Sequence, residues 1–132
     1  MRFASLGSGS RGNGSIVASQ TTIVLVDCGF IYKEAFARLK RLGLDPEDLD
    51  GILVTHEHSD HVSGVEVLAN KHSIPVYASR GTWIEIGIDR FDKPICIRHL
   101  FSIGDIDISP VTVPHDAREP LQFVFHCKGT RL

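Results

Sequence analysis

The stretch Thr55-His56-Glu57-His58-Ser59-Asp60-His61 directly follows the apolar run Ile52-Leu53-Val54. Three imidazoles and a carboxylate so close together are unsuited to a core, because each would need its own buried hydrogen-bond partner. If a strand ends near Thr55 and a helix begins near Asp60, His56 and His58 point to one side and Asp60 and His61 to another. The loop then offers two imidazoles to one metal ion, and a carboxylate with an imidazole to a second. This spacing is typical of a paired-metal hydrolase.

Asp60 has a simpler alternative explanation as a carboxylate at a helix N-terminus, where the helix dipole favours it. That alternative explains Asp60 and leaves His56, His58 and His61 unexplained. We therefore prefer the metal-site interpretation. Glu57 is not expected to be a ligand in this scheme.

The pattern HxHxDH, filled by His56, His58, Asp60 and His61 after an apolar strand, resembles the signature of the metallo-β-lactamase-fold hydrolases. Residues 5–13, 26–29 and 114–117 carry the same resemblance. Together they are most similar to the bacterial single-domain branch described as double-strand-specific 5′-to-3′ DNA exonucleases. The resemblance covers essentially all of residues 1–132, which we treat as one metallo-β-lactamase-like domain.

The resemblance implies a role for each site residue. His115 is expected to join His56 and His58 on the first metal, whereas Asp60 and His61 begin the second site and make Asp60 a catalytic residue. The resemblance also implies roles for two more carboxylates, one before the motif and one after it.

Asp27 is expected to orient a ligand histidine through a hydrogen bond, with a turn or cap residue as the alternative. Asp116 is expected to hold the His115 ring or a substrate water, and a plain turn residue is the open alternative. His72, His99 and His126 are expected to be surface or satisfied side chains.

A glycine-rich segment near the N-terminus is the second candidate feature. Gly9, Ser10, Gly12 and Asn13 belong to a loop whose backbone N–H groups can approach a phosphate. A turn that joins two hairpin strands is the alternative, and the glycine spacing matches neither phosphate-binding motif of nucleotide enzymes. Only the resemblance favours a substrate loop beside the active site.

Alternating strands and helices predict a mixed α/β (α+β) fold, and the resemblance implies an αββα sandwich. The segments 94–100 and 106–113 are predicted to be strands joined by a turn at 102–105, and one helix is predicted from about Asp60 to about Lys71. Segment 81–88 is ambiguous between a helix and irregular structure. Other strands are predicted at 2–6, 15–19, 22–27, 52–54, 74–78 and 121–127, with a helix at 32–42.

The resemblance places further metal ligands after a strand such as 121–127, and no Asp or His follows His126. The chain is therefore expected to be the N-terminal portion of the sandwich, with the C-terminal half missing and the second metal site incomplete. An unpartnered inner sheet face is expected to expose apolar surface and to favour self-association.

Composition places few further limits on the function and location of the protein. The net charge of −2 gives no overall attraction to nucleic acid, so phosphate binding has to be local. Three cysteines argue against a disulfide framework, and no apolar run is long enough for a membrane span. A cytoplasmic protein with no membrane contact is expected.

The predicted function is metal-dependent hydrolysis of phosphodiester bonds, with DNA as substrate and two divalent metal ions as cofactors. Zinc suits the imidazole-rich ligands, and manganese is the alternative. The same ligands would serve a hydrolase of small thioester, lactam or cyclic phosphodiester substrates. An inactive metal-binding fragment is the third possibility.

Overall fold

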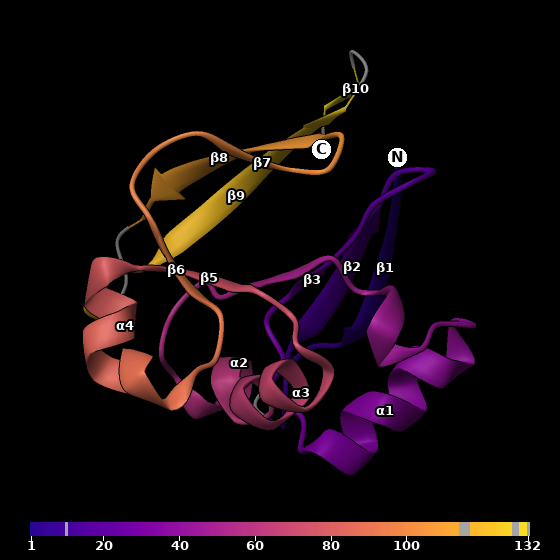
Figure 1. Cartoon of the computed structure of the whole chain (residues 1–132), viewed down its shortest axis with the longest axis horizontal. Coiled ribbons are helices and arrows are strands. Elements are labelled where there is room, and N and C mark those ends of the chain that lie inside the picture. The colour runs from indigo at the N-terminus through magenta and orange to yellow at the C-terminus, as the bar shows by residue number, and fades with distance from the viewer. Residues whose placement is uncertain (10, 114–116, 128–129, 132) are drawn as a thin grey trace.

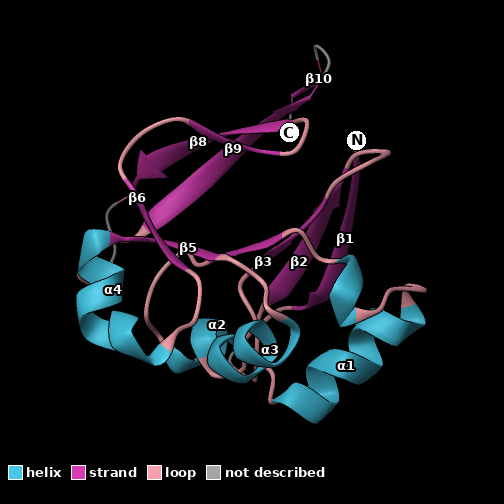
Figure 2. Ribbon diagram, in the orientation of Figure 1, coloured by secondary structure: helices cyan, strands magenta, loops and turns pink. Residues whose placement is uncertain are grey.

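A computed structural model describes residues 1–9, 11–113, 117–127 and 130–131, the last two by their backbone only. Two β-sheets face each other, and helices cover the outer side of one of them (Figures 1 and 2). The first sheet has the strand order β1-β2-β3-β4-β5-β6, and the second has the order β10-β9-β8-β7. The strands are β1 (Arg2–Gly7), β2 (Gly14–Ala18), β3 (Ile23–Val26), β4 (Gly51–Leu53), β5 (Val76–Ser79), β6 (Pro94–Ile97), β7 (Phe101–Ile103), β8 (Ile106–Thr112), β9 (Leu121–Cys127) and β10 (Thr130–Arg131).

The first sheet changes from antiparallel to parallel pairing at β3. The strands predicted at 15–19 and 22–27 form as β2 and β3 and pair antiparallel, while β3 to β6 run parallel and are connected through helices. The carboxyl ends of parallel strands meet at one edge of a sheet, where ligand-binding loops collect. The loop after β4 lies at this edge.

The three longer helices bury one side on the first sheet, whereas the four-residue helix Ser59–Val62 has no buried residue. In α1, Ala35 and Leu39 are fully buried, and Arg38 and Lys40 lie on its more exposed side. No helix in the described ranges has the length and apolarity needed to cross a bilayer. The helices are α1 (Tyr32–Arg41), α2 (Ser59–Val62), α3 (Val65–His72) and α4 (Arg80–Ile86), with the one-turn 3₁₀ helices η1 (Pro46–Asp48) and η2 (Ile88–Arg90).

The prediction of one helix after the histidine motif is wrong in its continuity, because the chain breaks between α2 and α3. Gly64 lies at the break, and its N–H donates to the carbonyl of Cys28 at 2.9 Å. A Cβ on Gly64 would lie only 1.8 Å from the carbonyl oxygen of Phe30. The break thus lets the chain press against residues 28–30.

The predicted hairpin of 94–100 with 106–113 is also wrong. β6 pairs with β5 in the first sheet, whereas β8 pairs with β7 in the second. A tight turn at Gly104, which has a φ of 56°, joins β7 to β8. The ambiguous segment 81–88 is largely the helix α4, whose first turn is capped by the Ser79 hydroxyl.

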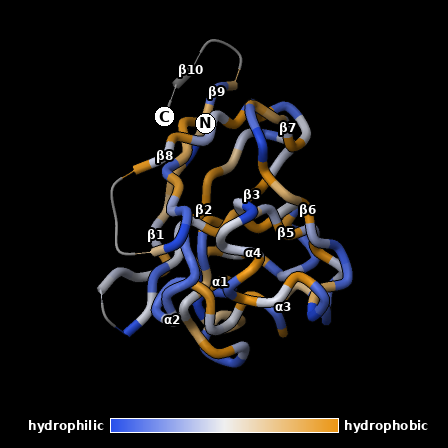
Figure 3. The backbone as a smooth tube through the Cα atoms, turned by 90° about the vertical axis from the view of Figure 1, so that its left-hand side faces the viewer, coloured by the Kyte–Doolittle hydropathy of each residue, from blue (hydrophilic) through white to orange (hydrophobic). Residues whose placement is uncertain are grey.

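The inner faces of the two sheets pack together. Val17, Val24 and Leu53 of the first sheet belong to one buried cluster with Ile108 and Phe125 of the second. Figure 3 colours the backbone by hydropathy and shows hydrophobic segments in the strands of both sheets. The expectation of an unpartnered inner face is therefore wrong.

The uncovered surface is the outer face of the second sheet. No helix of the described chain covers it, and exposed Asp107, Gln122 and His126 lie on it beside Val111. This face is more polar than the surface expected from the sequence. The described residues thus form three layers, helices, sheet and sheet, which agrees with the predicted fold class.

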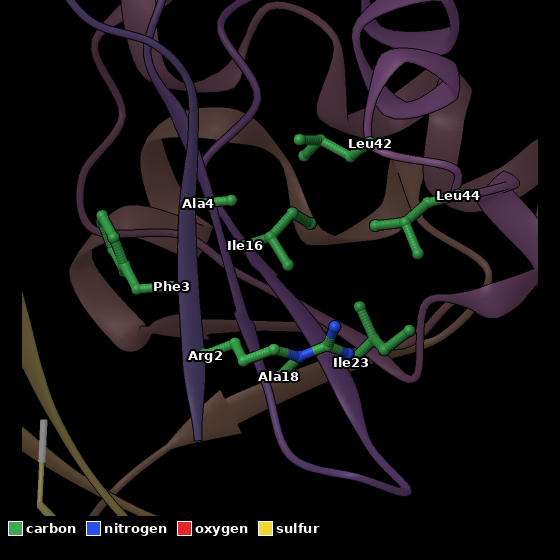
Figure 4. A pocket seen from close by; sticks show the side chains of 8 residues that line it. All are labelled: Arg2, Phe3, Ala4, Ile16, Ala18, Ile23, Leu42 and Leu44. Carbon is green, nitrogen blue, oxygen red and sulfur yellow. The ribbon is translucent and has the colours of Figure 1, made fainter.

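An apolar hollow of about 200 Å³ lies beyond the C-terminal end of α1 (Figure 4). Its lining includes Arg2 at the start of β1, Ile23 at the start of β3, and Leu42 after α1. The histidine loop follows the end of β4, which runs parallel to β3. The hollow therefore opens at the other end of the sheet and takes no part in the site described below.

Candidate metal centre

The imidazoles of the histidine loop gather at the carboxyl end of β4. The ring centroids of His56 and His58 lie 4.8 Å apart with the rings nearly perpendicular. Those of His56 and His61 lie 4.0 Å apart. His56 is buried, while His58 and His61 are half-buried. A strand, a short loop and the first turn of α2 thus bring three imidazoles together. The motif spacing predicted that His61 would point away with Asp60, whereas its ring lies closer to that of His56 than the His58 ring does.

Asp27, at the end of β3, lies beneath this loop and is 4% exposed. Its Oδ1 accepts the backbone N–H of Thr55 at 2.8 Å, and its Oδ2 accepts the Thr55 hydroxyl at 2.7 Å. The same Oδ2 lies 2.6 Å from Nδ1 of His61. Asp27 adopts a φ of 62°, a conformation that costs free energy in a non-glycine residue and recurs at functional sites.

This network determines the tautomers of two rings. A carboxylate only accepts hydrogen bonds, so Nδ1 of His61 carries a proton that it donates to Asp27. The single hydroxyl proton of Thr55 also goes to Asp27. Thr55 Oγ1 must therefore accept from Nδ1 of His56, 2.9 Å away. Both rings thus carry the proton on Nδ1 and the lone pair on Nε2, the form that binds a metal through Nε2.

The pKa of His61 reflects the same surroundings. Burial by itself lowers this pKa, since it disfavours the charged ring. The hydrogen bond and charge of Asp27, together with the charge of Asp60, outweigh burial and raise the pKa above its ordinary value. The loop is therefore an electronegative site that stabilises added positive charge.

Asp60 and the glycine-rich loop are in direct contact. Asn13 donates its backbone N–H to the carbonyl of Asp60 at 2.7 Å and its side-chain amide to Asp60 Oδ2 at 3.2 Å. Oδ2 of Asp60 also lies 3.7 Å from Nε2 of His61. The backbone of Gly29 also packs against Asp60, because a Cβ on Gly29 would lie 1.8 Å from the carbonyl oxygen of Asp60.

The side chain of Asn13 also closes the glycine-rich loop on itself. Its amide donates to the carbonyl of Gly9 at 2.9 Å, and its Oδ1 accepts the N–H of Gly9 at 3.1 Å. A Cβ on Gly12 would lie 2.7 Å from the Phe30 ring. The structure thus places Gly9, Gly12 and Asn13 in a loop beside Asp60, while Ser10 lies outside the described residues.

Comparison with known proteins gives the family. The sequence profile described as the Metallo-beta-lactamase superfamily matches residues 7–131. The chain belongs to the metallo-β-lactamase superfamily. It is 39% identical over 138 aligned positions to the exodeoxyribonuclease YycJ of Bacillus anthracis, and the alignment covers 100% of this chain and 52% of that protein. It is 37% identical to the exodeoxyribonuclease WalJ of Streptococcus pneumoniae, over 94% of this chain and 49% of that protein.

Solved structures give the same fold. The Rm3 metallo-β-lactamase superposes with a TM-score of 0.80 at 22% identity, covering 98% of this chain and 56% of that one. A B3 metallo-β-lactamase with an active-site glutamic acid superposes with a TM-score of 0.79 at 20% identity, covering the same fractions. The chain thus spans about half the length of the curated relatives it matches.

Membership of the metallo-β-lactamase superfamily implies divalent metal ions, and the donors present suit them. The Nδ1-protonated tautomers of His56 and His61 prepare Nε2 for a metal, and Asp60 adds a carboxylate beside them. Within the described ranges, no three His, Cys, Asp or Glu side chains are close enough to enclose an ion. The predicted ligand His115 and its neighbour Asp116 lie outside those ranges.

Other predicted histidines lie away from the centre. His72 is bound to the Tyr32 hydroxyl at 2.8 Å and to Glu47 at 3.0 Å in the helical layer. His126 is exposed on β9. Sequence reasoning missed Thr55, whose hydroxyl connects Asp27 to His56. The available signal was a hydroxyl residue between the apolar strand and the first histidine.

Proposed function

We propose that a protein of the relatives' full length that carries this chain is a metal-dependent phosphodiesterase, degrading duplex DNA from a 5′ end. The observation that carries the proposal is the hydrogen-bond network from Asp27 through Thr55, which places the protons of His56 and His61 on Nδ1 and leaves each Nε2 available to a metal. Metal ions bound here would supply an activated water and neutralise charge on phosphoryl oxygens. The relatives named above are exodeoxyribonucleases, which supports DNA as the substrate.

Each residue has a defined part in this proposal. His56, His58 and His115 hold the first metal, and Asp60 and His61 begin the second site. Zinc is the proposed metal because imidazole dominates the donor set, with manganese as the alternative. Two further carboxylates act on these ligands.

Asp27 keeps His61 in its ligand tautomer through the 2.6 Å hydrogen bond. Asp116 is proposed to hold His115 or a substrate water. We also propose that the protein acts in the cytoplasm, since its cysteine content suits a reducing compartment.

The glycine-rich loop is proposed to receive a phosphate of the substrate. Gly9, Ser10, Gly12 and Asn13 belong to this loop, and Asn13 fixes it against Asp60 through two donors. Backbone N–H groups in such loops bind anions without a side-chain charge. A local phosphate site of this kind agrees with a chain whose net charge is −2.

The test is a nuclease assay on a protein of full relative length that carries this chain, with end-labelled duplex DNA and added zinc or manganese. We expect stepwise loss of 5′ nucleotides that a chelator stops. Asp60→Ala should lower the rate by several orders of magnitude, because it removes a charged ligand from the second metal.

Cleavage that resists the chelator, or a wild-type rate in Asp60→Ala, would refute the metal assignment. Hydrolysis of small acyl substrates with no action on DNA would instead identify a thioester or lactam hydrolase. Metal uptake without any turnover would identify a metal-binding module.

Self-association is a separate proposal. The outer face of the second sheet is the surface that the described residues leave uncovered, and Val111 is 44% exposed on it. Light scattering at rising concentration tests this, and a monomer at all concentrations would refute it.

A further inference from the structure

Glu57 stands between His56 and His58, and its carboxylate is turned toward a distant part of the chain. Its Oε2 accepts the backbone N–H of Arg118 at 2.9 Å. Its Oε1 is buried and has no hydrogen-bond donor among the described residues. A buried carboxylate oxygen without a donor is unfavourable, and among the described residues the hydrogen bond from Arg118 to Oε2 is the contact that offsets this cost.

The segment that Glu57 contacts, the return segment (residues 117–121), is itself firmly held. Glu119 accepts the N–H of Gly81 through Oε1 at 2.7 Å and the hydroxyl of Ser79 through its carbonyl at 2.7 Å. A Cβ on Gly81 would lie 2.6 Å from that of Glu119, so the segment packs closely on the start of α4. These contacts tie the return segment to the start of α4.

The return segment holds the histidine loop at two points. The N–H of Leu121 donates to the carbonyl of Thr55 at 2.8 Å, just before His56. Arg118 donates to Glu57, between His56 and His58. The first contact fixes the entry to the loop and the second fixes its middle, so the backbone that carries both imidazoles is tied to α4.

We propose that Glu57 is a positioning residue for the metal centre, which sets the spacing of His56 and His58 by accepting the Arg118 N–H. The inference rests on the proposed function, because it takes these two histidines as metal ligands. The carboxylate acts through the loop backbone rather than on the metal. An uncharged oxygen acceptor in the same place should therefore serve almost as well.

The test compares Glu57→Gln, which keeps an oxygen acceptor, with Glu57→Met, which has a similar size but only a weakly accepting thioether sulfur. Zinc affinity of the chain is measured by competition with a chromophoric chelator, and exchange of the Arg118 amide is followed by NMR in metal-free protein. Glu57→Met should weaken zinc binding about 10-fold or more, as loss of groups that orient ligands does. It should also speed exchange of the Arg118 amide.

Glu57→Gln should change affinity by less than about 3-fold, because a neutral acceptor is weaker than a charged one but still bonds the amide. Glu85→Ala is the matched control, since Glu85 contacts the exposed side chain of Arg118 at 3.0 Å, whereas Glu57 bonds the Arg118 backbone. It should behave as wild type.

Equal losses in Glu57→Gln and Glu57→Met would overturn the inference, because the charge rather than the tie would then matter. Wild-type affinity in Glu57→Met would overturn it as well. His58→Ala separates this failure from failure of the proposed function. Unchanged zinc affinity in His58→Ala would refute the metal assignment itself. Weaker zinc binding in His58→Ala together with wild-type binding in Glu57→Met would refute only the role of Glu57.

Discussion

Asp27→Asn should disable the metal centre while leaving the fold in place. The asparagine amide has one oxygen and one NH₂ where the carboxylate has two acceptors. With NH₂ at the Oδ2 position, it donates to His61 Nδ1 and forces that ring into the tautomer with its proton on Nε2. With the amide turned over, NH₂ faces the buried N–H of Thr55, which now donates to Oδ1 at 2.8 Å. The first orientation therefore gives His61 the wrong tautomer for an Nε2 ligand, and the second leaves two donors facing each other at Thr55.

The magnitude follows from those contacts. Loss of a group that orients a ligand histidine weakens metal binding about 10- to 100-fold. This corresponds to about 1.4 to 2.7 kcal/mol of binding free energy. The unpaired buried donor should lower the free energy of unfolding by about 1 to 3 kcal/mol. The protein should therefore remain folded and bind zinc poorly.

Two measurements check this prediction. Zinc affinity is obtained by competition with a chromophoric chelator, and the ring tautomers are read from long-range ¹H–¹⁵N NMR of metal-free protein. Wild type should show the proton on Nδ1 in both His56 and His61. Asp107→Asn is the control, because Asp107 is exposed on the second sheet, away from the histidine loop, and accepts the Ser102 hydroxyl.

Two results would refute the reasoning. Asp27→Asn with wild-type zinc affinity would show that the carboxylate does not prepare the ligands. Nε2-protonated rings in the wild type would show that the network does not set the tautomers in the way the geometry indicates.

Three further predictions concern the surroundings of the site. Gly29→Ala should lower the midpoint of thermal unfolding well below that of Gly43→Ala, because its Cβ meets the Asp60 carbonyl at 1.8 Å. Gly43→Ala meets nothing within 4 Å and should show only the smaller cost of a side chain at a φ of 74°; equal midpoints would contradict this. Burial raises the pKa of Cys28 to about 11, so iodoacetamide at pH 8 should label half-buried Cys96 in the folded protein and reach Cys28 only after unfolding, as peptide mass spectrometry can show. Hydroxyl hydrogen bonds from the β2–β3 turn lower the pKa of Asp105 from 3.8 to about 2, so its stabilisation is complete above pH 3.8 and is lost as the pH falls toward 2. Asp105→Asn should therefore flatten the acid side of the stability curve, and an unchanged acid side would contradict the pKa assignment.

The sequence predicted the parts of the site that depend on local spacing. An apolar strand followed by histidines at alternate positions predicts that His56 and His58 lie on one side, and their ring centroids are 4.8 Å apart. The position of His61, 4.0 Å from His56, was not predicted, because it depends on the hydrogen bond to Asp27. The profile match confirms the family, and the solved structures confirm the fold class. Asp27 was predicted to bond a histidine, but spacing could not indicate which one.

The sequence could not predict what depends on close tertiary approach. The break between α2 and α3 follows from the contact of Gly64 with Phe30, which are 34 positions apart in the printed sequence. The partners of β6 and β8 were mistaken because an alternating pattern gives the exposure of a strand and not the sheet it joins. The role of Thr55 depends on a hydroxyl proton whose direction only the assembled network reveals. The roles of His115 and Asp116 stay predictions.

The metal content of the purified chain tests the central claim most directly. Elemental analysis after exhaustive dialysis should find about one tightly held divalent ion per molecule, because the first site is proposed to have three protein ligands and the second only two. His58→Ala should lose that ion while keeping its circular dichroism spectrum. A wild-type chain that retains no metal, or a His58→Ala chain that retains as much as wild type, would contradict the account.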